Sequence, residues 1–115
     1  MTLHLTPEIL VQAYELLRAT PPFKRWKLPH ADEVEFRVTQ SKDHSGSYQY
    51  AGKHIIRISA LHHKQLPPLI VTLAHEMCHM HQHLTAPTDT AHHGWRFKKY
   101  AALACRHHGI VPETF

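Results

Sequence analysis

The chain has 115 residues, 43% of them hydrophobic, which is enough for a single domain with one modest core. No apolar run approaches the roughly 20 residues that span a bilayer, and the start of the chain lacks a signal-peptide pattern. We therefore expect a soluble, cytoplasmic protein that contacts no membrane. The chain has two cysteines and no CxxC pair, which excludes a cysteine-built zinc ribbon and argues against a disulfide framework. The formal net charge of +4 favours an acidic partner, and DNA is one candidate. The basic residues form two clusters, one of Lys24, Arg25 and Lys27 and one of Arg96, Lys98, Lys99 and Arg106.

The N-terminal part of the chain predicts a helix. Thr6 is a good N-cap, Pro7 suits the first helical position, and apolar residues then recur at helical spacing. Pro21 and Pro22 cannot continue the helix, so we expect it to end before them.

The middle of the chain predicts strands. Apolar and polar residues alternate over 34–38, which indicates a strand with one wet face. Residues 47–50 and 54–58, separated by a turn at 51–53, predict a hairpin. We therefore expect a short, mainly antiparallel sheet, with an edge for an extended peptide somewhere in residues 47–58.

A second helix is predicted from Pro67 to about Leu84, and a last one from about Gly94 to His107 with Gly109 as its stop. At 100° per residue, the second helix has one apolar stripe that we expect in the core. The stripe consists of Leu69, Leu73, Met77, Met80 and Leu84. His75 and His79 project about 120° away from it, with Glu76 between the two sides. The two histidines are therefore available for something other than core packing.

Residues 75–79, with the sequence HEMCH, match HExxH, the most informative motif in the chain. Histidines four apart on a helix lie about 6 Å apart along its axis, so both can reach one metal ion. A glutamate beside the first histidine is placed to deprotonate the attacking water. The residue types predict a zinc hydrolase, although a chain with 14 histidines also produces such a motif by chance in roughly one case in ten.

A catalytic zinc commonly has three protein ligands and one open position, so a third ligand is needed. His83 lies on the same side of the helix as His75 and His79, but it is about 12 Å from His75 along a straight helix. His92 and His93 follow a loop that can return over the metal face, and Asp89 or Glu113 would give a carboxylate ligand. The HExxHxxGxxH arrangement is absent.

The HEMCH motif at 75–79, followed by His93-Gly94-Trp95-Arg96-Phe97, resembles the pattern of SprT-like zinc metallopeptidases, the family that includes Spartan. That family has HExxH followed by a histidine–glycine pair, two further residues and phenylalanine. The likeness covers most of residues 5–108, but only these two short motifs are specific.

The resemblance implies that His75, His79 and His93 bind Zn²⁺ and that Glu76 is the general base. It also implies a protease acting on protein or peptide substrates, and the eukaryotic members of the family cut proteins crosslinked to DNA. The implied fold is a single α+β, zincin-like domain over residues 1–115, with an N-terminal helix, the sheet and hairpin, the HExxH helix and a C-terminal helix. We expect a monomer.

Three points stay open at the level of sequence. The alternative function is a non-hydrolytic, zinc-stabilised domain that binds DNA or protein, and Glu76 is the feature that such a domain does not need. Trp95 and Phe97 are expected to be core residues that hold His93 in place. A second group that stabilises the reaction is often present, and the candidates are Tyr48, Tyr50, His54, Arg57 and His92.

Overall fold

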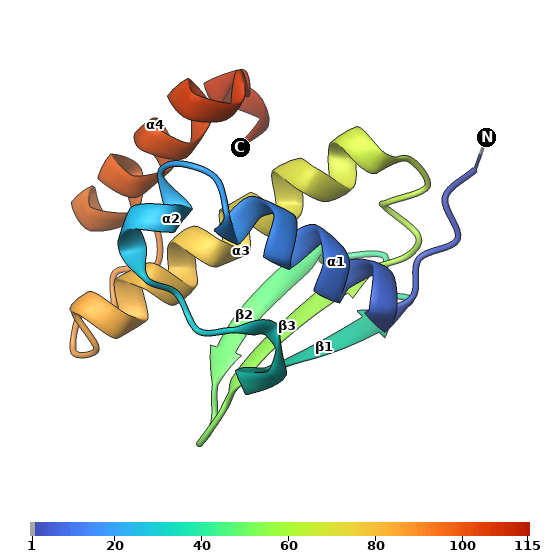
Figure 1. The fold of residues 1–115 in the computed structure, drawn as a ribbon, viewed down its shortest axis with the longest axis horizontal. Coiled ribbons are helices and arrows are strands. Elements are labelled where there is room, and N and C mark those ends of the chain that lie inside the picture. The colour runs from blue at the N-terminus through green and yellow to red at the C-terminus, as the bar shows by residue number, and fades with distance from the viewer. Residues whose placement is uncertain (1) are drawn as a thin grey trace.

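The computed structural model describes residues 2–115, and its helices and strands occur in the predicted order (Figure 1). The elements are α1 (Pro7–Arg18), α2 (Phe23–Trp26), a 3₁₀ turn (Ala31–Glu33), β1 (Val34–Thr39), β2 (Gly46–Tyr50), β3 (His54–Ser59), α3 (Leu66–Thr85), α4 (Trp95–His108) and a second 3₁₀ turn (Pro112–Thr114). The α+β class is confirmed. None of the helices in the described residues is both long and apolar enough to cross a membrane.

The sheet is mixed, with strand order β1-β3-β2. The predicted hairpin of β2 and β3 is present and antiparallel, whereas β1 pairs with β3 in parallel. The strand β2 occupies one side of β3, and β1 pairs with the other side. The central strand is therefore β3, which has a neighbour on both sides. Of the residues 47–58 that were expected to contain an edge for an extended peptide, only those of β2 lie at an edge of the sheet.

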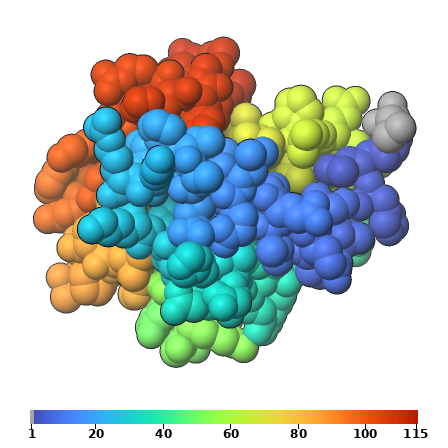
Figure 2. Space-filling view, viewed as in Figure 1, coloured from blue at the N-terminus to red at the C-terminus, as the bar shows by residue number. Residues whose placement is uncertain are grey.

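The helices lie on one face of the sheet. In the strand register, Phe36, Tyr48, Ile56 and Ile58 project to the same face, and α1 and α3 pack there (Figure 1). The last helix, α4, contacts α3 and lies on the side of α3 that faces away from the sheet (Figure 1). In the space-filling view, the N-terminal third of the chain covers the middle of the front face (Figure 2). The HExxH helix is thus enclosed between sheet, α1 and α4.

The predicted helix ends are confirmed. The side chain of Thr6 accepts a hydrogen bond from the backbone N–H of Ile9 at 3.2 Å, with Pro7 in the first position. Gly109 ends α4 in the left-handed conformation (φ 66°), which is strained for residues with a side chain.

The apolar stripe of α3 is confirmed for four of its five members. Leu69, Leu73, Met77 and Met80 are fully buried, but Leu84 is 46% exposed, so its assignment to the core was wrong. No residue of α3 after Gln82 is buried, because the last turn extends past the elements that cover the helix. Helical periodicity gives the direction of a side chain but not how far its partners reach.

The short helix α2 was not predicted. Its residue Trp26 packs against side chains of both α3 and α4. The ring of Trp26 stacks on His81 with centroids 4.1 Å apart, and Tyr100 of α4 packs against the same imidazole at 4.4 Å. The Nδ1 atom of His81 is buried without a hydrogen-bond partner, and burial lowers the pKa of this imidazole to about 4. His81 is therefore an uncharged packing residue.

Acid is expected to destabilise the zinc-free protein partly through His81. Below pH 6.5 the unfolded chain protonates this imidazole while the folded chain does not, so stability falls between pH 6.5 and pH 4. The difference between the two pKa values corresponds to about 3 kcal/mol. His81→Phe keeps the stacking and removes the titrating group, so urea unfolding should show a smaller loss between pH 8 and pH 4.5 than in wild type. An equal loss in the two proteins would contradict this account.

Candidate metal centre and active site

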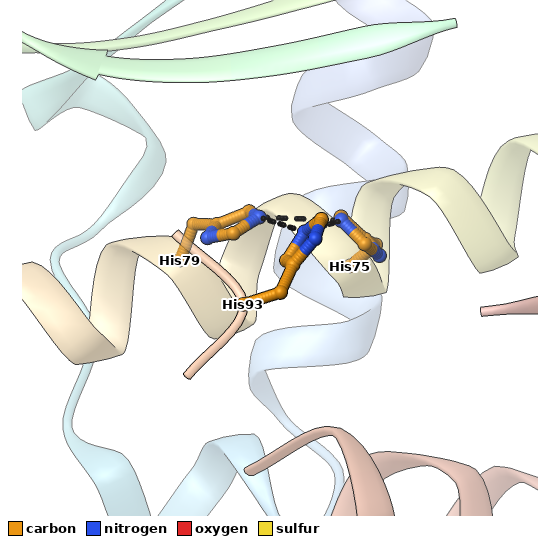
Figure 3. A group of neighbouring side chains, drawn as sticks. All are labelled: His75, His79 and His93. Atoms are coloured by element: carbon orange, nitrogen blue, oxygen red, sulfur yellow. Dashed lines mark hydrogen bonds between the residues drawn. The ribbon is translucent and has the colours of Figure 1, made fainter. Parts of the chain in front are cut away.

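Three histidines converge on one point between α3 and the loop before α4 (Figure 3). His75 and His79 lie one turn apart on α3, and His93 approaches from the loop. The Nε2 atom of His79 is 3.2 Å from that of His75, and the Nε2 atom of His93 is 3.3 Å from that of His75 and 3.2 Å from that of His79. The three nitrogens form a nearly equilateral triangle.

This triangle fits a tetrahedral metal ion. Zinc–imidazole bonds of 2.0–2.1 Å at tetrahedral angles place the nitrogens about 3.3 Å apart, as they are here. Nδ1–H of His75 donates to the main-chain oxygen of Phe115 at 2.6 Å, so in the neutral ring Nε2 carries the lone pair. Burial lowers the pKa of His75 and His93 and brings that of His79 to about 3, which favours the neutral form that binds metal. The group could hold a metal ion, with a fourth position left open.

The loop that carries His93 is fixed from both sides. Asp89 accepts hydrogen bonds from the backbone N–H of Ala91 at 3.0 Å and from Arg96 at 2.9 Å. Gln82 of α3 donates to the carbonyl oxygen of Ala91 at 2.9 Å. These bonds tie the loop to itself, to α4 and to α3, and so they set the position of His93.

Phe97 forms the floor under the three histidines. It is 5% exposed, and its ring centroid is 4.8 Å from His75, 4.2 Å from His79 and 4.6 Å from His93. Its prediction as a core residue is confirmed. The parallel prediction for Trp95 was wrong, because this side chain is 67% exposed at the first position of α4, with the Arg96 guanidinium 4.5 Å from its ring centroid.

Glu76 lies beside the histidine triangle and is 5% exposed. Burial raises the pKa of its carboxyl group to about 8. The strand β2 passes so close that a Cβ atom at Gly46 would lie 3.2 Å from Oε2 of Glu76 and 2.8 Å from the Thr72 methyl group. Gly46 therefore permits the close approach of edge strand and helix, and the predicted strand, which began at residue 47, did not include it.

A buried histidine supports this region from behind. Nδ1–H of His63 donates to the carbonyl oxygen of Ser59 at 2.7 Å, and its Nε2 accepts from the Thr72 hydroxyl at 2.7 Å. The hydrogen bond between His63 and Thr72 connects the segment after β3 to α3, one turn before Glu76. Its signal in the sequence was too weak to distinguish it among 14 histidines.

A cavity of about 390 Å³ opens above the triangle. Its walls come from the β1–β2 loop, β2, α3, the His93 loop and the C-terminal segment. The residues that line it include Gly46, Tyr48, Thr72, Glu76, His92, the three converging histidines and Phe115. A buried carboxyl group, a potential metal site and an edge strand thus share one cavity.

The other candidates for the third ligand are not part of the triangle. His83 stacks on Tyr50 with ring centroids 4.6 Å apart, and Asp89 is engaged by Arg96. Within residues 2–115, neither these two nor Glu113 or His92 joins the group that could hold a metal. The geometry selects His93, and its role as a ligand stays a prediction.

Comparison with known proteins agrees with this arrangement. A family model described as the SprT-like family matches residues 14–114, a span that contains Glu76 and all three histidines. A search of curated proteins returned no match to the chain.

Proposed function

The chain belongs to the SprT-like family, and from this premise we propose that it is a zinc-dependent metallopeptidase that hydrolyses peptide bonds. The observation that carries the proposal is the triangle of Nε2 atoms with the buried carboxyl group of Glu76 beside it, in one cavity. A purely structural zinc site has four protein ligands and needs no acid or base next to it.

His75, His79 and His93 would hold the zinc ion. Bound zinc supplies Lewis-acid chemistry, which polarises the substrate carbonyl group and makes water more acidic. Among the first-row metals that imidazole accepts, zinc also suits tetrahedral geometry without redox chemistry.

Glu76 would move the proton. A carboxylate oxygen of Glu76 takes a proton from water as the water oxygen bonds to the carbonyl carbon. The same carboxyl group then delivers that proton to the amine nitrogen as the C–N bond breaks, so the products are a carboxylic acid and an amine. Burial raises the pKa of this group to about 8 in the zinc-free protein, so it holds a proton more readily than an exposed carboxyl group does.

The substrate would bind along β2. Of the strands in the described residues, β2 pairs only with β3, so one side of its backbone is free beside the cavity. An extended segment can add to such an edge through main-chain hydrogen bonds, which favours unfolded segments over folded proteins.

A second candidate function, the binding of DNA or another acidic partner, has one observation in its favour. Aromatic contacts, such as Trp26 with Tyr100 at 5.2 Å, pack α2 against α4, the helices at which the two basic clusters of the sequence lie. Their exposed members are Lys24, Arg25, Lys27, Lys98, Lys99 and Arg106. Exposed basic side chains would suit substrates that are bound to DNA, and also a domain that binds without cleaving.

Removal and return of zinc test the proposal directly. The purified, tag-free protein should contain about one zinc per chain and cleave fluorescein-labelled casein, an unfolded substrate. A chelator should abolish cleavage, and stoichiometric zinc should restore it, because the proposed mechanism depends on zinc to polarise the carbonyl group. A protein that retains zinc and never cleaves would instead support the binding domain, and a folded protein without zinc affinity would contradict both functions.

A further inference from the structure

We infer that His92 is a further catalytic residue, whose ring N–H donates a hydrogen bond to the substrate carbonyl oxygen as negative charge develops on it. The inference rests on the proposed function, because the charge arises only if a peptide bond is hydrolysed. Donors aimed at such an oxygen contribute strongly in a site that excludes water. The sequence left five candidates for this donor, and the structure separates them.

Arg57 is excluded by the pleat of the sheet. It is opposite Ser47 in the β2–β3 register, on the face away from α3, and its guanidinium donates to Gln49 at 2.9 Å. The cavity lies on the other face, where Gly46 and Tyr48 contribute to its walls. A guanidinium on the far face does not reach a substrate at Glu76.

Tyr50, Tyr48 and His54 are engaged with other groups. Tyr50 stacks on His83, and neither Tyr50 nor His54 lines the cavity. Tyr48 does line it, but its hydroxyl forms a 2.7 Å hydrogen bond with Nδ1 of His54. Because His54 belongs to the central strand, this bond directs the hydroxyl group of Tyr48 under the sheet, away from the free edge of β2.

His92 is exposed, lines the cavity and stacks on a proposed ligand. Its ring centroid is 4.3 Å from that of His79, with only 19° between the planes, and 4.4 Å from that of His93. Within residues 2–115 no hydrogen bond engages its ring nitrogens, so an N–H is free for a substrate. A neutral imidazole always carries one N–H, so the role does not require protonation.

His44 is the other histidine in the cavity wall outside the triangle, and it is less well placed. It belongs to the loop between β1 and β2, and its ring contacts none of the three converging histidines in the described residues. His92 stacks directly on His79, one of the three histidines that would hold the zinc ion, and it also lines a smaller adjoining cavity of about 140 Å³. A substrate carbonyl group at the open position of the triangle is thus within reach of His92.

The test separates hydrogen bonding from packing. His92→Phe keeps an aromatic ring against His79 and removes the N–H, whereas His92→Asn and His92→Gln place an amide N–H near the positions of Nδ1 and Nε2. For His92→Phe we expect kcat on fluorescein-labelled casein to fall about 100-fold, with KM and zinc affinity within about twofold of wild type. At least one amide variant should recover about tenfold over His92→Phe, and His107→Phe, a change of an exposed histidine on α4, should match wild type.

Other outcomes overturn the inference in distinguishable ways. A His92→Phe variant with unchanged kcat would show that the N–H plays no part. A parallel loss of zinc affinity, measured by competition with a chelating dye, would show that His92 only supports His79. A wild type that binds zinc and cleaves no casein would overturn the proposed function and the role of His92 with it.

Discussion

Replacing His93 by alanine is expected to lower zinc affinity roughly 10²- to 10³-fold while the fold stays intact. Four-ligand zinc sites bind with apparent free energies of about 10–16 kcal/mol, so one ligand contributes about 2.5–4 kcal/mol. The His93 side chain is exposed, and the loop that carries it is held by Asp89, Gln82 and Arg96 rather than by the imidazole. The variant should therefore lose the metal and not the structure.

Competition with a chelating dye would measure the affinity, and circular dichroism would follow the fold. His107→Ala is the matched control, because it removes an exposed imidazole of α4 outside the triangle. Zinc affinity within about threefold of wild type in His93→Ala would remove His93 from the ligand set, since the loss of a true ligand exceeds that range. His75 and His79 alone would then have to account for binding.

Much of the fold was predictable because its elements carry local signals. Thr6 and Pro7 specify the start of α1, Gly109 specifies the end of α4, and the alternation on either side of 51–53 specifies the hairpin. The parallel pairing of β1 with β3 was not predictable in this way. It joins residues about 20 positions apart, and it depends on which side of β3 the hairpin leaves free.

The candidate site was predictable in part. Helical spacing alone places His75 and His79 together, but the return of His93 depends on contacts of Gln82 and Asp89 with the loop, which no periodicity shows. The family motif supplied that residue. No pattern indicated that the main-chain oxygen of Phe115 would orient His75, because any residue type can offer a backbone acceptor.

Glu76→Gln is expected to keep the zinc and lower kcat about 10³-fold, which is within the range for loss of a general acid–base group. Glutamine has nearly the same shape, so it fits the narrow space beside Gly46, but its amide cannot take a proton from water. Glu76→Asp should lose about 100-fold, because the carboxylate withdraws by about 1 Å from the reacting atoms. Glu8→Gln, an exposed change in the first turn of α1, is the control and should match wild type.

The same variant has a second signature in the zinc-free protein, which does not depend on any substrate. The pKa of Glu76 is raised to about 8 in the folded chain from 4.5 when exposed, so the folded state holds a proton that the unfolded state has lost. Stability is therefore highest below pH 4.5 for this group and falls as pH rises toward 8, by on the order of 4 kcal/mol. Glutamine is uncharged throughout. In urea unfolding, wild type should therefore lose this free energy relative to Glu76→Gln between pH 5 and pH 8.5, on top of the histidine titrations that both proteins share. Undiminished cleavage together with an unchanged pH dependence would remove Glu76 from the mechanism. Lost cleavage together with a lost pH dependence would show that the protein retains a costly buried carboxyl group because the reaction needs it.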